Sequence, residues 1–518
     1  MNTRTLRENV AQMVMPRIDG PRLDEPGYRS SVQALIREGM GGFILFGGDI
    51  ENTPRFLREF QGLAEIPLLI ASDVERGLGQ QLTGGTGFPS QRAVASAISR
   101  SAKKDVALLD RMLEAVRVET RQAGIHAVFS PVVDVNNNPD NPIICTRAFG
   151  EEPDVVEWFG SKYIRGLQKP WGNGSQALLA CAKHFPGHGD TDQDSHSVLP
   201  VINADRLRLN RLELPPFREA VKDGVAMVMV AHLLVPALDP EQPTTFSKKT
   251  ITALLREGMA FDGLIVSDAL DMGALAEKYS QEDIAVRAVE AGIDILLHPR
   301  DARLTIDAVV SAVERGRLSA SRIQESVDRI LAAKARLGLF DRAEHAQPSI
   351  DYLKHRQIAQ ELGRKALAFV QGSKHDFPPG TDMAVSCFVL DDDNNSASGN
   401  VLLQGMKERF RNFSSLTLVP DADMPASRLK ESIQASGCVV LAVFSRISAS
   451  KGRSGISDRL RNIGLEILHS AKTSGARSIV VSFDSPYILD LFREADVRIA
   501  AYDRMAEIQR AVVELLVG

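Results

Sequence analysis

The densest group of reactive side chains lies in one short stretch, KHFPGHGDTDQDSH, which runs from Lys183 to His196. It contains three histidines, three aspartates and a lysine directly after an apolar run, a composition unlike that of ordinary surface loops. Within it, Asp194 and His196 are two residues apart, so in an extended segment their side chains project to the same side. They can form a hydrogen-bonded pair. Histidine titrates near neutral pH, and a carboxylate beside it stabilises its protonated form, so the stretch has the residue types that proton transfer requires.

Further polar residues follow short apolar runs elsewhere in the first 300 residues. They are Asp73, Lys183 with His184, His232, Asp268 and His298. A polar residue at the end of one strand is commonly a loop residue satisfied by its neighbours. Five runs that end in this way favour a shared site over five unrelated loops, because the carboxyl ends of parallel strands meet at one face.

The elements that would position these residues are short β-rich runs alternating with amphipathic helical segments, as far as about residue 340. Eight such runs are predicted to be strands: Val10–Met15, Phe43–Phe46, Leu68–Ser72, Ala127–Ser130, Leu178–Ala182, Ala226–Ala231, Leu264–Ser267 and Ile293–Leu297. Eight parallel strands with intervening helices close into a TIM-type (β/α)8 barrel, whose catalytic groups lie at the carboxyl ends of the strands.

A second domain is predicted after the barrel, since 518 residues exceed one ordinary core. We expect a catalytic domain over 1–345, a linker with one helix over 346–378, and a doubly wound α/β/α sandwich over 379–518. Its strands are predicted at Met383–Leu390, Ser415–Val419, Cys438–Ser445, Ser478–Phe483 and Val497–Tyr502. The acidic run Asp391–Asn395 is interpreted as a solvated loop, in preference to a ligand loop, and no chemistry is assigned to this domain.

Composition excludes several classes of protein. A formal charge of −5 with well-mixed acids and bases lacks the basic stripe that nucleic acid requires. Neither a secretory signal nor an apolar run of about eighteen residues is present, so we expect a cytoplasmic protein without a membrane segment. The four cysteines, Cys145, Cys181, Cys387 and Cys438, are widely spaced and are expected to be reduced thiols. No metal or other cofactor is expected, and the oligomeric state is not indicated.

The KHFPGHG stretch with its following Asp-x-His pair resembles glycoside hydrolase family 3, in particular its β-N-acetylglucosaminidase branch. The resemblance extends over the first domain, through IASDVERG around Asp73, PVVDVNNNPDNPIICTRAFG around Arg147, and GLIVSDALDM around Asp268. It implies a retaining enzyme that releases terminal N-acetylglucosamine from small glycosides, or from muropeptides during cell-wall recycling.

The same resemblance implies a role for each matching residue. Asp268 would be the nucleophile, His196 the general acid/base and Asp194 its partner. The terminal sugar would be held by Asp73, Arg147, Lys183 and His184. Because the acid/base comes from the barrel loop, the second domain is not expected to supply a catalytic group. Only two tryptophans are present, Trp158 and Trp171, which favours a pocket for one sugar over a long stacking groove.

One motif departs from the family pattern DxEGGxVxR, because this chain reads DVERGLGQQ. Gln81 stands where a sugar-binding arginine is expected, and Arg76 stands where the first glycine is expected. The sugar preference is therefore open, and a β-glucosidase is one alternative. A phosphorylase is another, because a histidine repels incoming phosphate less than a carboxylate does.

Two hypotheses that assign the protein to other functional classes are also open. A metal-dependent hydrolase could use the metal-binding residue types of the motif, which are His184, His188, Asp190, Asp194 and His196. Pro186 and Gly187 argue against the helix that would bring two of the histidines together. A sugar-binding protein without catalytic activity is the other, and the presence of both catalytic candidates argues against it.

Overall fold

The computed structural model describes residues 4–172, 174–341, 349–373, 380–395, 397–421, 426–447 and 451–518, and it divides into two compact units. Unit 1 consists of residues 1–88, 110–138 and 148–355. Unit 2 consists of residues 89–109, 139–147 and 356–518. Unit 2 is therefore built from three separate stretches of chain, two of which interrupt the region that was expected to form the catalytic domain alone.

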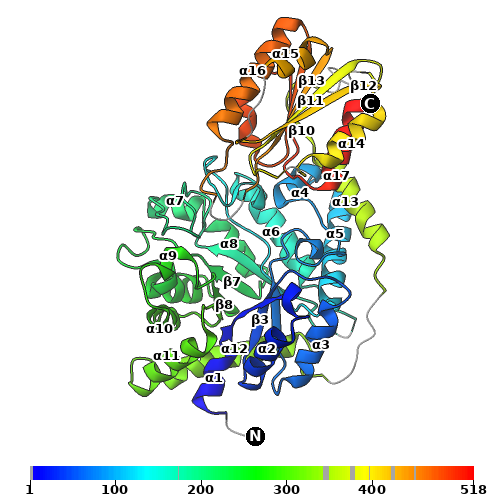
Figure 1. Ribbon diagram of the computed structural model, residues 1–518. Coiled ribbons are helices and arrows are strands. Elements are labelled where there is room, and N and C mark those ends of the chain that lie inside the picture. Colours follow the sequence, from blue (N-terminus) through cyan, green and yellow to red (C-terminus); the bar gives the residue numbers. More distant parts are fainter. Residues whose placement is uncertain are drawn as a thin grey trace. The chain divides into compact units, whose positions relative to one another are not determined.

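Unit 1 is built on a curled sheet of parallel strands. Seven strands pair in the order β2-β3-β4-β5-β6-β7-β8, and β1 pairs in parallel with β9. An isolated parallel bridge between Val266 and Ile295 continues the pairing from β8 toward β9. In Figure 1, the labelled strands β3, β7 and β8 are surrounded by helices. Strands β4, β6, β7 and β8 are buried on both faces, which explains why they read as largely apolar runs.

The strands of unit 1 are β1 (Val14–Met15), β2 (Arg17–Asp19), β3 (Gly42–Phe46), β4 (Leu69–Ser72), β5 (Ala127–Val128), β6 (Leu179–Phe185), β7 (Met227–Val230), β8 (Leu264–Ser267) and β9 (Leu296–Leu297). Its helices include α1 (Leu6–Gln12), α2 (Pro26–Arg37), α3 (Thr53–Leu63), α6 (Pro153–Leu167), α7 (Arg206–Arg211), α8 (Pro215–Lys222), α9 (Gly273–Ala276), α10 (Gln281–Ala291), α11 (Ala302–Glu314) and α12 (Ala320–Arg336). Two helices, α5 (Lys103–Gln122) and α13 (Tyr352–Ala366), run from one unit into the other.

The predicted first strand, Val10–Met15, is wrong in its first half. Val10, Ala11 and Gln12 form the end of α1, and the strand begins at Val14. A capping box starts this helix, in which the Thr5 side chain accepts from the Glu8 amide and the Glu8 side chain accepts from the Thr5 amide. This local signal outweighs the apolar run that follows it. The short strand β2 was not predicted.

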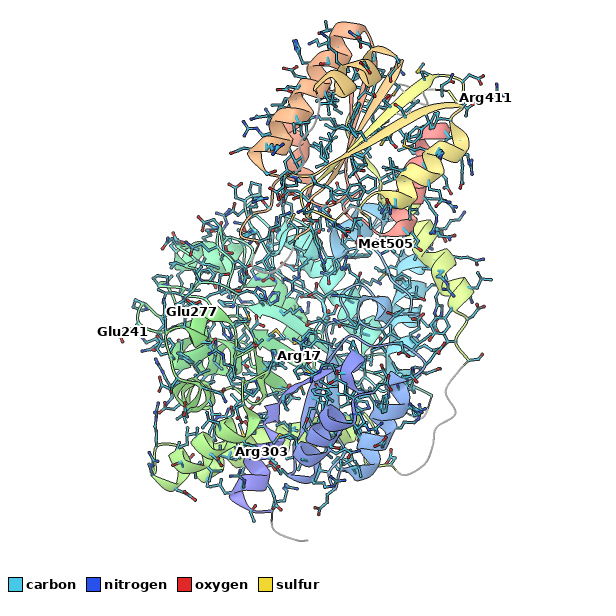
Figure 2. All side chains as sticks on the ribbon, viewed as in Figure 1. Arg17, Glu241, Glu277, Arg303, Arg411 and Met505 are labelled. Atoms are coloured by element: carbon cyan, nitrogen blue, oxygen red, sulfur yellow. The ribbon has the colours of Figure 1, made fainter. Side chains whose placement is uncertain are left out.

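Unit 2 contains a six-stranded sheet in the order β10-β15-β14-β13-β11-β12. All pairs are parallel except that of β10 with β15. The parallel part has the 2-1-3-4-5 strand order of a doubly wound fold. In Figure 1, α15 and α16 lie on one side of this sheet and α14 and α17 on the other. Met505, labelled in Figure 2, immediately precedes α17.

The strands of unit 2 are β10 (Ala368–Gln371), β11 (Ala384–Asp391), β12 (Asn412–Leu418), β13 (Cys438–Phe444), β14 (Arg477–Ser482) and β15 (Val497–Ala500). Its helices include α4 (Gln91–Ala97), α14 (Asn400–Arg409), α15 (Ala426–Gln434), α16 (Asp458–Ser474) and α17 (Ala506–Val517). Of the region expected to be a linker, α13 supplies the helix and β10 is an edge strand. The parts of that region at 346–348 and 374–378 lie outside the described residues.

The acidic run after β11 is not the solvated loop that was expected. Asp392 is buried and pairs with Lys451 at 3.2 Å and with Arg453 at 2.8 Å. Asp393 pairs with Lys451 at 3.0 Å and with Arg504 at 2.7 Å. These basic partners are 58 or more residues away in sequence, so no local sequence pattern predicts the ion pairs. Among the described residues, no helix combines the length and apolar character that crossing a bilayer requires.

Candidate active site

The polar residues predicted to share a site lie at the carboxyl ends of alternate strands of unit 1. Asp73 comes directly after β4, Lys183 and His184 are among the last three residues of β6, and Asp268 comes directly after β8. All these strands are parallel, so these residues stand at the same edge of the sheet. The predicted grouping on one face thus has a direct structural basis.

Lys183 is the centre of an ion-pair group. Its Nζ lies 2.7 Å from Asp73 Oδ1 and 2.7 Å from Glu75 Oε1. The lysine and Glu75 side chains are almost fully buried, whereas that of Asp73 is 27% exposed. A buried ammonium requires a carboxylate partner, and Glu75 provides one that the sequence analysis did not identify. The exposed part of Asp73 is therefore the part of this group that a bound molecule can reach.

His184 is fixed by a carboxylate that was also missed, Asp134. The Nδ1 atom of His184 lies 2.7 Å from Asp134 Oδ2, and the backbone amides of His184 and His188 both donate to Asp134 Oδ1. Asp134 is completely buried. Burial raises its pKa, but the charge and the hydrogen bond of His184 outweigh burial and hold the pKa below the usual range. Asp134 thus stays ionised and orients the imidazole.

Asp194 and His196 form the predicted pair. His196 Nδ1 lies 2.7 Å from Asp194 Oδ1, and the His196 backbone amide donates to the same oxygen at 2.9 Å. The Asp194 side chain is 2% exposed and that of His196 is 36% exposed. The carboxylate is therefore inside the protein, while part of the imidazole faces outward.

The segment 187–202, which we call the dyad loop, joins β6 to α7 and carries this pair. His188 Nε2 lies 3.0 Å from Ser195 Oγ, and His188 Nδ1 lies 3.1 Å from Thr191 Oγ1. Burial lowers the pKa of His188 to about 4, so the ring is neutral near pH 7. A Cβ atom at Gly189 would lie 1.7 Å from the Val135 carbonyl oxygen, which explains the glycine in this motif.

Asp268 begins the turn after β8. Its backbone amide donates to the Val230 carbonyl at 3.0 Å, and its Oδ1 accepts from the Ala269 amide at 2.8 Å. Burial raises the pKa of Asp268, but the charges of His184 and His232, the Ala269 hydrogen bond and His196 together lower it below the usual value. The structure thus brings an ionised carboxylate within electrostatic reach of three histidines.

The two histidines without a predicted role have separate surroundings. His232 is fully buried, with Nε2 2.9 Å from the Ala269 carbonyl and Nδ1 2.6 Å from Thr245 Oγ1. Because a carbonyl only accepts, Nε2 carries a hydrogen and His232 holds the residue after Asp268. His298 has a positive φ of 47° and pairs with Asp271 at 3.1 Å.

The residues of the unusual DVERGLGQQ segment are tied to the backbone. Gln81 Oε1 accepts from the Gly47 amide at 3.2 Å, and Gln81 Nε2 donates to the Asp73 carbonyl at 2.9 Å. Gln81 thus connects the loops after β3 and β4, next to Asp73. Near this edge, the guanidinium of Arg17, which is labelled in Figure 2, lies 4.7 Å above the Phe46 ring centroid.

Arg147 belongs to unit 2, whereas the other predicted site residues belong to unit 1. It ends a short 3₁₀ helix, Cys145–Arg147, that belongs to unit 2, and its Nη1 donates to the Ile143 carbonyl at 3.1 Å. Among the described residues, no three or more His, Cys, Asp or Glu side chains are arranged to hold a metal ion.

These features define a glycosidase-like site: an ionised carboxylate after β8, a histidine–carboxylate pair on the loop after β6, and polar groups at the same sheet edge. A family model, the glycosyl hydrolase family 3 N-terminal domain, matches residues 5–333. The chain therefore belongs to glycosyl hydrolase family 3. The predicted resemblance is confirmed.

Individual relatives agree with this assignment. The chain is 27% identical over 507 residues to β-hexosaminidase A of Pseudoalteromonas piscicida, covering 89% of this chain and 82% of that one. It is 28% identical over 386 residues to a β-N-acetylglucosaminidase/β-glucosidase of Cellulomonas fimi, covering 72% and 66%.

A solved family 3 β-N-acetylglucosaminidase from Paenibacillus sp. str. FPU-7 is 29% identical, with a TM-score of 0.85, covering 99% of this chain and 97% of that one. The predicted enzyme class, a glycoside hydrolase of the β-hexosaminidase type, is thereby confirmed.

Proposed function

We propose that the protein is a retaining exo-β-N-acetylglucosaminidase in which Asp268 is the nucleophile. The observation that carries this proposal is the arrangement around Asp268: its pKa is held below the usual value, and His196, paired with a buried carboxylate, interacts with it electrostatically. An ionised carboxylate and a separate proton donor are the two groups that a retaining glycosidase requires.

In the first step, Asp268 attacks the anomeric carbon as the bond to the leaving oxygen breaks, and His196 gives that oxygen a proton. In the second, water attacks the same carbon, its proton passes to His196, and Asp268 is released. Since Nδ1 of His196 faces Asp194, Nε2 is the atom that transfers the proton. Asp194 stabilises the imidazolium and holds the ring in one orientation, as a buried carboxylate does in hydrolytic triads.

Sugar binding is proposed for the remaining residues of the sheet edge. Asp73 can accept hydrogen bonds from two hydroxyls, and the Lys183 ammonium, 2.7 Å from its Oδ1, fixes the position of the carboxylate. His184, held by Asp134, presents its other ring nitrogen as a donor or acceptor. Arg147 is proposed to contact the sugar on the basis of the family motif alone.

The closure of the barrel, the mode of action and the natural substrate are also part of the proposal. We propose that the parallel sheet of unit 1 is a closed (β/α)8 barrel, in which the Val266–Ile295 bridge and the β1–β9 pair continue the ring. The scarcity of tryptophan favours exo action on small glycosides. Trimming of muropeptides in the cytoplasm during cell-wall recycling is proposed from the family resemblance.

The experiment is hydrolysis of 4-nitrophenyl N-acetyl-β-glucosaminide by wild type and Asp268→Asn, in phosphate-free buffer with chelator. Release by wild type, with a loss of at least about 10³-fold in the variant, supports the proposal. No release by wild type, or equal release by both, would show that the substrate class or the nucleophile is wrong. Activity that disappears with chelator would instead favour a metal-dependent hydrolase.

A β-glucosidase activity on the same site is a second candidate, because Gln81 replaces the expected arginine and the Cellulomonas fimi relative carries both activities in its name. The ratio of kcat/KM for the glucoside and the N-acetylglucosaminide decides between them. Phosphorolysis is tested in phosphate buffer, where N-acetylglucosamine 1-phosphate would be the product.

A further inference from the structure

We infer that Gly273 is a positioning residue for His196, and that through it the loop after β8 sets the place of the acid/base relative to the nucleophile. The inference rests on the roles proposed above for His196 and Asp268. It concerns a contact between two backbone segments of unit 1, the turn that follows Asp268 and the dyad loop.

The contact is short and leaves no room for a side chain. The Gly273 amide donates to the His196 carbonyl at 3.1 Å. A Cβ atom at Gly273 would lie 2.7 Å from that carbonyl oxygen and 3.1 Å from the Ser197 carbonyl oxygen. The φ of Gly273 is not positive. Glycine is therefore required here for space and not for its backbone freedom, and alanine would displace the dyad loop by several tenths of an ångström.

The turn that presents Gly273 is itself tied to the nucleophile. Asp268 Oδ1 accepts from the Ala269 amide, and the Met272 amide donates to the Ala269 carbonyl at 3.2 Å. The same carbonyl accepts from His232 Nε2 at 2.9 Å. Gly273 then begins α9. The position of the Gly273 amide is thus determined by the same short turn that carries Asp268.

On the other side of His196, the dyad loop is held by a side chain. Ser195 Oγ lies 3.0 Å from Nε2 of the buried His188. Two contacts thus anchor the loop at His196: the Ser195 hydroxyl with His188, and the His196 carbonyl with the Gly273 amide. Asp192 and Gln193, earlier in the loop, are exposed. Loss of either anchor is expected to shift the imidazole. Asp194 belongs to the same loop, so its hydrogen bond to His196 is expected to persist.

A shift of the imidazole affects proton donation more than nucleophilic attack. Misplacement of a catalytic group by about 1 Å can cost about 10²-fold in rate. A sugar leaving group needs the proton, whereas dinitrophenolate is stable enough to leave without it. A variant that only displaces His196 must therefore lose activity on the first kind of substrate and retain it on the second.

The test compares kcat/KM of Gly273→Ala on N,N′-diacetylchitobiose and on 2,4-dinitrophenyl N-acetyl-β-glucosaminide. We expect a loss of about 10- to 100-fold on chitobiose and less than about threefold on the dinitrophenyl glycoside. Gly62→Ala in α3 is the matched control, because a Cβ there meets nothing within 4 Å, and both of its kcat/KM values should stay within about twofold of wild type.

His196→Ala gives the limiting pattern, and Ser195→Ala removes the second anchor without adding an atom, so it remains informative if Gly273→Ala fails to fold. Equal losses on both substrates in both variants, or no loss in either, would overturn the inference while leaving the proposed function intact, provided that His196→Ala is selective. If His196→Ala itself shows no selectivity, the acid/base assignment and the inference are both wrong.

Discussion

Replacing Asp134 by asparagine removes one hydrogen bond from the site and leaves two. In the wild type, Asp134 Oδ1 accepts from the backbone amides of His184 and His188, and Oδ2 accepts from His184 Nδ1. An asparagine oxygen can still accept from both amides. Its NH2 group, however, can only donate, so a protonated His184 Nδ1 loses its acceptor.

The cost of this change follows from burial. Asp134 is completely buried, so no water replaces the lost bond. A hydrogen bond to a charged group contributes about 1.5–3 kcal/mol. If that bond orients His184 toward the sugar, the same free energy corresponds to a loss of about 10- to 100-fold in kcat/KM. We expect such a loss for Asp134→Asn, together with a lower midpoint of thermal unfolding.

Hydrolysis of the 4-nitrophenyl substrate and thermal unfolding measure the two effects. Asp307→Asn is the control, because its exposed pair with Arg7 at 2.5 Å is expected to contribute at most about 1 kcal/mol. Wild-type values of both kcat/KM and the unfolding midpoint in Asp134→Asn would refute the argument that this carboxylate orients the imidazole.

Three other predictions concern charge. Lys334 is fully buried and donates to Gln12 Oε1 at 2.7 Å, and burial lowers its pKa to about 7. Because the pKa is lower in the folded state, stability is lost as pH falls from about 10.5 to 7. Lys334→Met should therefore raise the midpoint of thermal unfolding near pH 7 and leave it unchanged at about pH 11. Burial likewise lowers the pKa of His188 to about 4, so the wild type should lose stability as pH falls from about 6.5 to 4. Thermal unfolding at those two pH values should show a smaller fall in the unfolding midpoint for His188→Gln than for the wild type. Arg147→Ala should raise KM for the 4-nitrophenyl substrate about tenfold and leave the unfolding midpoint within a few degrees, whereas an unchanged KM would remove Arg147 from the sugar site.

The sequence was sufficient for those parts of the fold and site in which the signal is local. The apolar runs of β3, β4 and β8 are long and buried on both faces, so their predicted bounds lie within one residue of those observed. The Asp194–His196 contact was predictable from a spacing of two residues. Strand ends also identified Asp73, Lys183 and Asp268, since parallel strands place their carboxyl ends together.

Residues that act through distant partners were missed. Glu75 stands inside the IASDVERG motif around Asp73, yet its contact with Lys183 joins residues at two different strand ends. Asp134 lies inside the quoted PVVDV stretch, but only its burial beside His184 shows what it does. The same holds for the ion pairs of Asp392 and for the Gly273 amide, whose partners lie far along the chain. A sequence pattern carries no information on such pairings without an alignment.

The three-part composition of unit 2 has a consequence for dissection of the gene. Ser90, from an early segment, donates to the Asp503 carboxylate and the Tyr502 carbonyl, and Ser96 donates to the Ala366 carbonyl. A stop codon after His355 would thus leave residues 89–109 and 139–147 without the part of unit 2 on which they pack. Truncation at this point would therefore remove the packing partners of both early segments at the same time.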